Sequence, residues 1–400
     1  MFLAMKMSNA KKLNNAIVTI AIVIILITFG ARASNNMIGT TMPLLAKEYF
    51  NYNNTEIGLL ATVFMGFMFI MSNFINTKIK SKTRRKLFIL SSIVYTITFL
   101  LFYISNSIMI WPVAALSGFS IGALMPNLIT SAGLFDDRKL RERMLAIYSL
   151  SLSTSLLIGP AIESIILRYY TIQQSFLFFA IIASVVPILS PFLKFPETEH
   201  ELGSDSSLKN IVRNNGFKVA LLNNLTYQVP FAFIITFDGI YAKTVFHASN
   251  SIAILLYSLF FITSFFGRLF LAAKPVPNIK FLIDLSVLLT IIGLLVAWIS
   301  PNIYVFIIAL LILGIPHGFT YTLSIVTLSR TFDVKLRNAA NSYFFSTMSL
   351  IGAILPSMLG ILVDVTSLRW GFVAILPIII AVFYFTEMYA RQVKELKMYI

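Results

Sequence analysis

Apolar residues occur along this chain in long, almost uninterrupted runs that are separated by short polar segments. Stretches of 18 or more mostly apolar residues recur, and each is long enough to cross a hydrocarbon layer about 30 Å thick. Backbone polar groups in lipid must be paired within the segment, and the runs lack the alternation of membrane strands, so they are predicted to be helices. Twelve helices are predicted, over residues 14–38, 55–77, 86–105, 108–134, 143–167, 174–194, 216–242, 250–273, 280–299, 302–328, 338–363 and 370–390.

Composition supports an all-α integral membrane protein. Of the 400 residues, 58% are apolar and 12% are charged, whereas a soluble domain has about 45–50% apolar and about 25% charged residues. The chain has no cysteine, which excludes disulfides, thiolate metal sites and cysteine nucleophiles. The first apolar segment is interpreted as helix 1 and not as a cleavable signal, because a long polar helical continuation and many further spans follow it.

The distribution of basic residues predicts how the chain crosses the membrane. The net charge of +15 would fit a nucleic-acid-binding protein. However, nearly all Lys and Arg residues lie in the tails and in alternate loops, such as 78–86, 136–143 and 330–337. This asymmetry is typical of cytoplasmic loops of membrane proteins. We therefore expect a multi-pass protein of a prokaryotic plasma membrane with both termini in the cytoplasm, and no nucleic-acid partner.

One long polar connection divides the chain into two halves. It separates a predicted N-terminal six-helix bundle, 1–195, from a C-terminal six-helix bundle, 216–400, with a cytoplasmic linker at 196–215. The halves also share features at an offset of 196 residues. Gly118 and Gly122 match Gly314 and Gly318, and Asn54 matches Asn250. Matches at one shared offset in helices and loops predict a parallel internal repeat.

With these features the chain resembles a transporter of the major facilitator superfamily. The resemblance covers nearly the whole chain: twelve helices, a 6+6 repeat, both ends inside and a long central loop. Helix 5 carries Gly159-Pro160, which resembles the Gly-Pro motif associated with antiporter-type exporters, although Glu163 replaces its later glycine. The loop at 78–86 keeps the basic end of the family motif but lacks its preceding glycine and acid. The resemblance implies the fold of this superfamily and secondary transport of a small molecule.

Charged residues within apolar helices are candidates for function because burying a charge in lipid is costly. Arg32 lies on a polar stripe of helix 1, at helical spacing with Asn36. Its guanidinium can bind an anionic or hydroxyl-rich substrate or interact with a carboxylate. The alternative is an arginine that extends to the outer interface. In the family that the chain resembles, the first helix lines the central cavity, so we predict that Arg32 and Asn36 bind substrate.

Two carboxyl groups lie at a similar predicted depth, Glu163 in helix 5 and Asp238 in helix 7. A carboxyl group in an apolar environment can take up and release a proton near neutral pH. We therefore predict that both couple transport to protons and that at least one pairs with Arg32. The alternative for each is a residue at the outer end of its helix in contact with water.

Four further residues are candidate substrate ligands. His317 lies in the middle of helix 10 and can contact substrate or relay protons, or it can instead bond to a carbonyl freed by Pro316. The other candidates are Asn127, Gln228 and Asn341, for which the alternative is a hydrogen bond between helices.

Other residues are interpreted as structural. Gly118 and Gly122, with their repeat partners, are expected to allow close packing of helices 4 and 10. Asp284 is expected to form an ion pair near Arg268 and Lys274.

The sequence contains no nucleotide-binding loop, metal cluster or nucleophile triad, so we expect neither an enzyme nor a cofactor. The favoured function is proton-coupled export of hydrophobic or amphiphilic compounds or metabolites by a monomer. The alternative is import of an anionic or polar metabolite, and a remote alternative is a membrane sensor that does not transport.

Overall fold

The structure is a computed structural model and describes residues 2–76, 79, 81–135, 137–193, 195, 206–273, 278–332 and 334–396. All of its regular secondary structure in these residues is helical. The N-terminal half contains α1 (Phe2–Phe50), α2 (Asn54–Ile70), α3 (Ser81–Tyr103), α4 (Ile110–Ala132), α5 (Arg138–Ile166) and α6 (Ile172–Leu189). The C-terminal half contains α7 (Ser206–Arg213), α8 (Asn215–Phe246), α9 (Asn250–Ala273), α10 (Ile279–Ile299), α11 (Ile303–Thr331), α12 (Val334–Thr366), α13 (Leu368–Ala374) and α14 (Leu376–Ala390).

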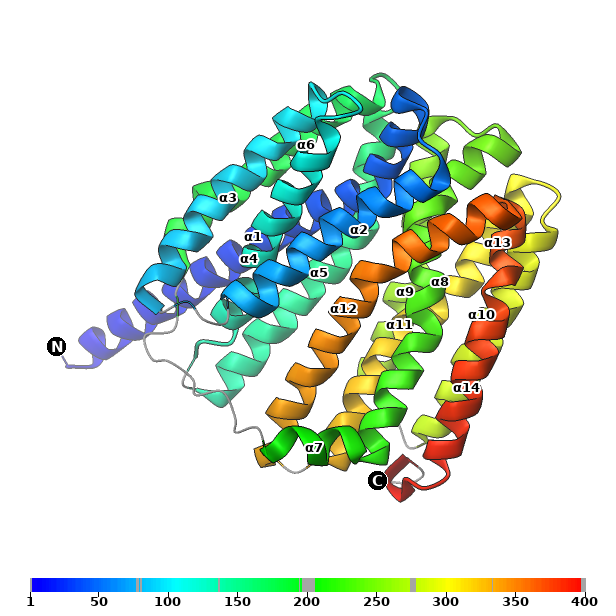
Figure 1. Cartoon of the computed structure of the whole chain (residues 1–400). Helices are drawn as coiled ribbons and strands as arrows, with labels where there is room; N and C mark the ends of the chain where they lie inside the picture. The colour runs from blue at the N-terminus through cyan, green and yellow to red at the C-terminus, as the bar shows by residue number, and fades with distance from the viewer. Residues whose placement is uncertain are drawn as a thin grey trace.

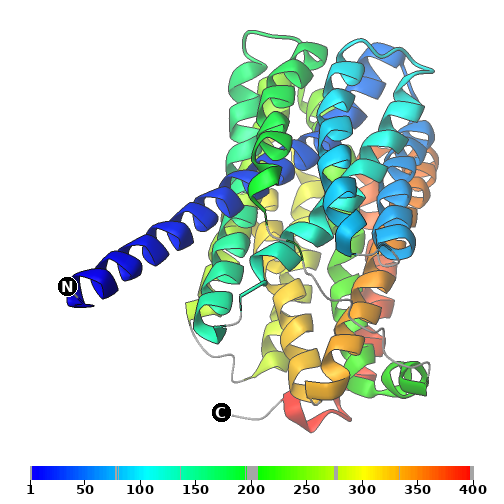
Figure 2. The same cartoon turned by 90° about the vertical axis from the view of Figure 1, so that its left-hand side faces the viewer.

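Twelve segments of the described chain are long and apolar enough to span a membrane, which confirms the predicted number. Helices α1–α6 form one six-helix bundle, and α8–α12 with α13 and α14 form the other (Figure 1). We call the end that carries α7 and the C-terminal segment the terminal end, and the end that carries the turns at 51–53 and 247–249 the distal end. In Figure 2 the first part of α1 projects away from both bundles. The bundle boundaries at 195 and 216 stay a prediction, because the first half of the linker, 196–205, lies outside the described residues.

Most predicted helix ends are accurate to about five residues, but α1 begins at Phe2, twelve residues before the predicted start at 14. Helix α1 continues to Phe50, twelve residues beyond the predicted end at 38. The polar residues that follow position 38, such as Thr40 and Thr41, are fully buried, so they continue the helix inside the protein. The twelfth span is broken at Ile375, directly before the turn that contains Pro377, because proline has no N–H to continue the preceding helix.

Glycines allow the helix pairs within each bundle to pack closely. A Cβ atom at Gly118 would overlap the carbonyl of Phe64 on α2, and one at Gly314 would overlap the carbonyl of Phe260 on α9. Phe64 and Phe260 are themselves 196 residues apart, as are the two glycines. This confirms the predicted packing role and shows that the repeat extends to contacts between helices.

Large apolar side chains cover the outside of the bundles. Leu90 is 61% exposed, Ile108 79% and Val365 80%. A soluble monomer rarely exposes apolar surface so widely, so this surface is suited to lipid.

Candidate functional site

Polar side chains concentrate at the boundary between the two bundles, near the middle of the spans. Arg32 lies midway along the membrane-spanning part of α1 (Ile17–Phe50) and is half-buried. Gly159 of α5 lies against Ala33, with 3.3 Å between a Cβ built at the glycine and the Cβ of Ala33. The Gly-Pro motif of α5 therefore brings this helix close to α1 beside Arg32.

Arg32 has cationic and aromatic neighbours from both bundles. Its charge interacts with Tyr95 of α3 and Tyr148 of α5 in its own bundle. It also interacts with Arg268 of α9 and His317 of α11 in the other bundle. We call Arg32, Arg268, His317 and Tyr148, together with Tyr321 of α11, the central cluster. None of its members is a carboxylate.

His317 is held in a wall of aromatic rings. Its Nδ1 lies 2.7 Å from the Ser264 hydroxyl. The imidazole stacks on Phe231, with ring centroids 4.5 Å apart. Phe260 and Phe261 complete the wall, at centroid distances of 5.2 Å and 5.5 Å. Ser264 thus fixes the ring orientation through Nδ1, and the histidine lies at the midpoint of α11, next to Pro316.

The two predicted proton-coupling residues lie in a separate layer nearer the distal end. Glu163 is fully buried and accepts a hydrogen bond of 2.5 Å from the Thr41 hydroxyl, while its Oε2 has no partner in the described part of the chain. Asp238 is 1% exposed, and neither of its oxygens has a described partner.

Tyr257 of α9 lies near these two acids. Its hydroxyl accepts a hydrogen bond from the Gly239 backbone N–H at 3.0 Å and donates to the Ile235 carbonyl at 3.3 Å. The same hydroxyl interacts electrostatically with both Asp238 and Glu163. We call Glu163, Thr41, Tyr257 and Asp238 the acidic layer; it includes residues of both bundles.

The predicted pairing of Arg32 with one of these acids is wrong in this structure. Thr41, which binds Glu163, follows Arg32 by nine residues, or about 13 Å along a helix. No ion pair of Arg32 occurs among the described residues. The prediction assumed equal depth from the helix starts, but Glu163 lies three residues from the end of α5, whereas Arg32 lies mid-span.

The amide candidates are distributed over different places. Asn127 donates a hydrogen bond to the Asn76 side chain at 2.8 Å and joins α4 to the end of the second span. This is the predicted alternative to substrate binding, a hydrogen bond between helices. Asn36 is 7% exposed on α1, and its Nδ2 lacks a described partner. Gln228 lies against α12 beside Gly352. It follows Arg32 by 196 residues, so it is the repeat equivalent of this arginine.

Asn341 lies near the start of α12 and is half-buried. The structure therefore brings Arg32 and His317 together, and it places Glu163 and Asp238 in a second group. It does not bring Asn127 or Asn341 into contact with either group.

Arg268 was not among the predicted site residues. It lies inside α9, five residues before its end. The ion pair expected of Asp284 is present, and its partner is Lys280 at 2.6 Å; Lys274 lies outside the described residues. The signal was present, since the predicted helix 250–273 already contained Arg268.

Contacts across the bundle boundary at the distal end are specific. The Asp364 carboxylate of α12 accepts hydrogen bonds from the backbone N–H groups of Asn54 and Thr55 at 3.1 Å and 2.8 Å. It also accepts from both side chains, at 2.7 Å and 2.6 Å. An acid of one bundle thus caps the first turn of α2 in the other bundle.

Two further distal contacts join the bundles. The Ser164 hydroxyl of α5 lies 3.0 Å from the Ser251 hydroxyl of α9. Glu48 of α1 forms an ion pair with Lys243 of α8. Nearer the terminal end, Ser346 donates a hydrogen bond to Asn73 at 2.8 Å. We call the contacts of Asp364, Ser164–Ser251 and Glu48–Lys243 the distal seam.

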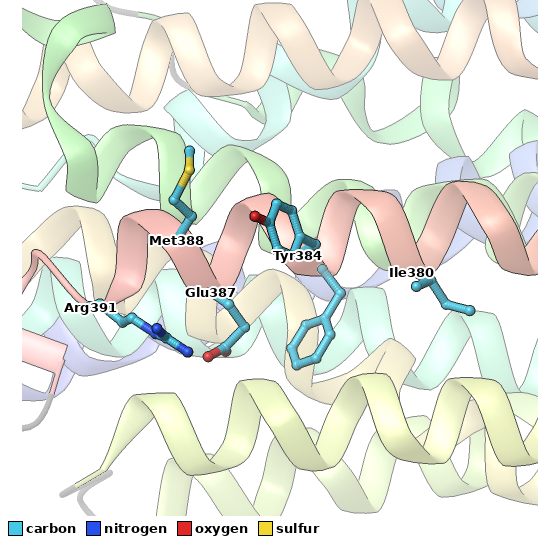
Figure 3. Close-up of a pocket in the computed structure, with 6 residues that line it drawn as sticks. Ile380, Tyr384, Glu387, Met388 and Arg391 are labelled. Atoms are coloured by element: carbon cyan, nitrogen blue, oxygen red, sulfur yellow. The ribbon is translucent and has the colours of Figure 1, made fainter.

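A pocket on α14 lies apart from these groups. Figure 3 shows its lining residues, Ile380, Phe383, Tyr384, Glu387, Met388 and Arg391. All six belong to one face of a single helix and its last turn, and Tyr384 is 66% exposed. The pocket is therefore a shallow groove in the outer surface of the protein and not a site between the bundles.

Two apolar-surfaced helical bundles with polar groups buried at their boundary define a class of multi-pass membrane transporters. The family model of the Major Facilitator Superfamily matches residues 24–283 and 276–397. The chain belongs to this superfamily, as the sequence resemblance implied.

Solved structures agree with this family assignment at the level of the fold. The chain is similar to a bacterial homologue of the human lysosomal transporter Spinster in an inward-facing and occupied conformation, with 14% identity, a TM-score of 0.74 and coverage of 94% of this chain and 98% of that chain. It is similar to the nucleoside transporter NupG, with 14% identity, a TM-score of 0.70 and coverage of 92% and 98%.

It is also similar to a POT family transporter in complex with a thioalcohol-conjugated peptide, with 11% identity, a TM-score of 0.77 and coverage of 93% and 96%. No curated protein sequence matches the chain. The transporters named here differ in what their names say they carry, so the likeness establishes the fold and not the solute.

Proposed function

We propose that the chain is a secondary transporter that couples movement of a small solute to movement of protons by alternating access. The observation that carries this proposal is the acidic layer. Glu163 and Asp238 are buried carboxyl groups at the bundle boundary, and three of their four oxygens have no described partner. A carboxyl group held without a partner in an apolar environment is costly to keep charged, and its protonation depends on access to water.

Alternation between two states would change that access. The distal seam closes the boundary beside Glu163 and Asp238 in the present conformation. Opening the seam would hydrate both acids and favour their charged forms, whereas closure favours their neutral forms. Proton release and uptake would therefore follow the conformational cycle, and solute bound in the central cluster would move in the same cycle.

The test measures proton movement and solute exchange separately. Proteoliposomes loaded with a pH-sensitive dye are given a panel of solutes, and the solute that moves protons is then followed with an imposed pH gradient and in gradient-free exchange. Glu163→Gln and Asp238→Asn should abolish gradient-driven accumulation and keep much of the exchange.

Glu56→Gln is the matched control, because Glu56 closes a capping box on α2 and glutamine can replace it there. The control should behave as wild type in both assays. Wild-type accumulation by both acid variants would refute the role of the acidic layer.

A second candidate function is export of hydrophobic or amphiphilic compounds. It is favoured by the aromatic wall of Phe231, Phe260 and Phe261 and by the Gly159-Pro160 motif, which lies beside Arg32. Quenching of the three tryptophans by a hydrophobic cation would distinguish the two candidates. An exporter of hydrophobic compounds should bind such a cation, whereas a cationic site for another kind of solute should repel it.

The membrane topology belongs to the same proposal. We propose that the terminal end faces the cytoplasm of a prokaryotic cell, that the protein acts as a monomer in the plasma membrane, and that it is not an enzyme. The basic loops at the terminal end support this orientation. A reporter that is active only in the cytoplasm should be active when fused at Lys82 or Asp205. A reporter that is active only outside the cell should be active when fused at Lys47 or Lys243.

A further inference from the structure

We propose that Arg32 and Arg268 together bind the negatively charged group of the solute, a carboxylate or a phosphate, between the two bundles. This inference rests on the proposed transport function and names the class of solute as small organic anions. The two arginines come from different bundles, Arg32 from α1 and Arg268 from α9, and their charges interact. The sequence predicted substrate binding by Arg32 but assigned no such role to Arg268.

Neither arginine has a negatively charged partner among the described residues. The ion pairs found among the described residues involve Lys243 and Lys280, and neither arginine takes part in one. Asp284, which was expected to form an ion pair near Arg268, is bound to Lys280. Charged side chains at the depth of membrane-spanning helices ordinarily pair with another charge or mark a substrate path, so two guanidinium groups with no described carboxylate partner leave a site for an anion.

Both guanidinium groups keep N–H donors that have no described partner. Each guanidinium has five N–H donors in a planar fork that matches a carboxylate or phosphate. The Nε atoms of Arg32 and Arg268 are buried without a described partner. The one described hydrogen bond of the Arg268 side chain goes from Nη1 to the Ser153 hydroxyl at 3.3 Å, which is long and leaves the other donors available.

The two arginines are also partly accessible from outside the protein. Both arginines are half-buried, and Tyr321 beside Arg268 is 42% exposed although it lies at the level of the membrane-spanning helices. Tyr321 also interacts electrostatically with Tyr148 of the opposite bundle. Each arginine therefore keeps part of its surface accessible to a small polar molecule.

The acidic layer does not neutralise this site. Thr41, which binds Glu163, lies about 13 Å along α1 from Arg32. A solute anion would instead supply the missing charge and contact both bundles at once. An anion that bridges two like charges favours the states in which the bundles approach each other, which is how a bound solute can promote the transition between states.

The experiment measures equilibrium binding to the purified full-length protein in nanodiscs, without any proton gradient. The probes are succinate, glycerol 3-phosphate and inorganic phosphate, with succinamide and glycerol as neutral counterparts of the first two. Titration is followed by calorimetry and by the thermal shift of tryptophan fluorescence. We expect at least one anion to bind and neither neutral compound to bind.

The variants are Arg32→Gln and Arg268→Gln, with Arg168→Gln as the control because Arg168 is exposed beyond the distal end of α5. Loss of a hydrogen bond to a charged group should weaken binding and raise the Kd of the anion at least about tenfold. The control should bind as wild type. Arg32→Lys and Arg268→Lys keep the charge but lose the planar fork, so they should fold as wild type and bind with intermediate affinity.

Three results would overturn the inference: no binding of any of the three anions to the wild type, equal binding of a neutral counterpart, or wild-type Kd in both glutamine variants. These results are separable from failure of the proposed function. Glu163→Gln should still bind the anion, because binding needs no proton gradient. Anion binding without proton-driven transport would refute only the coupling, and proton-driven transport of a neutral solute would refute only the anion site.

Discussion

At the scale of single residues, the two polar groups of the boundary differ in what they lack. The central cluster has positive charge without a described negative partner, and the acidic layer has carboxyl oxygens without described donors. Helix α1 contributes to both groups, through Arg32 and Thr41. Arg32 and Thr41, which binds Glu163, lie on one helix but in different layers, so the helix can respond to solute binding in one layer and to protonation in the other.

A residue kept without partners should reduce stability. Asp238 has two buried oxygens without described partners, and an unsatisfied buried polar group costs about 1–3 kcal/mol. Asp238→Val replaces the carboxyl group with an apolar side chain of similar volume. We expect this variant to raise the melting temperature by about 2–4 °C, and to lose proton-driven accumulation.

Differential scanning fluorimetry on tryptophan and tyrosine emission measures the melting temperature, since the chain has no cysteine for thiol dyes. Asp284→Val is the control, because it removes an acid that is paired with Lys280 and should lower the melting temperature. A lower melting temperature for Asp238→Val would show that Asp238 has a partner that stabilises it.

At the scale of helices, close packing depends on glycine at repeat-related positions. Gly→Leu at Gly118 or Gly314 would drive a side chain into the backbone of α2 or α9. Overpacking of this kind costs about 1–3 kcal/mol or more, so both variants should have lower expression and melting temperatures.

Gly66 is a suitable control, because a Cβ at this position meets no atom within 4 Å. Gly66→Leu should therefore change stability much less than Gly118→Leu. Unchanged stability together with altered solute preference for Gly118→Leu would mean that this glycine lines the transport path.

The cap that Asp364 provides joins one helix to a helix of the other bundle. Asp364→Asn keeps the shape but loses the charge and one strong acceptor for the α2 terminus, where a negative charge is favourable by about 0.3–1 kcal/mol. We expect weaker distal closure and a faster reaction of an introduced Thr55→Cys thiol with a membrane-impermeant maleimide.

The control for this substitution is Asp137→Asn, which changes a cap on α5 within one bundle. Asparagine is itself a good cap residue, so this variant should leave labelling unchanged. Equal labelling rates in Asp364→Asn and the parent would show that this cap does not stabilise closure.

At the scale of the whole molecule, apolar periodicity and charge asymmetry were sufficient to predict twelve spans, and the offset of 196 residues predicted the packing of Gly118 and Gly314. These features follow from local composition. The central cluster could not be predicted in the same way, because Arg268 comes near Arg32 only through the packing of α9 on α5 and of α5 on α1. The depth of Glu163 relative to Arg32 likewise depends on the length and tilt of α1, which extends to Phe50.

Alternating access predicts that the distal seam must open during transport. Ser164 and Ser251 provide a direct test, because their hydroxyls lie 3.0 Å apart across the boundary. The natural chain has no cysteine that could interfere. The double variant Ser164→Cys, Ser251→Cys should form a disulfide on mild oxidation, since the two side chains already lie within bonding range.

The cross-linked protein should lose at least about nine-tenths of its solute exchange, in proportion to the disulfide formed, and reduction should restore it. Each single variant should transport as wild type under the same oxidant. Anion binding from the terminal side should persist in the cross-linked protein, because the central cluster lies closer to that end than the seam does. Exchange that continues at the wild-type rate when the disulfide is complete would mean that the distal seam stays closed throughout transport, and the proposed cycle would have to be rejected.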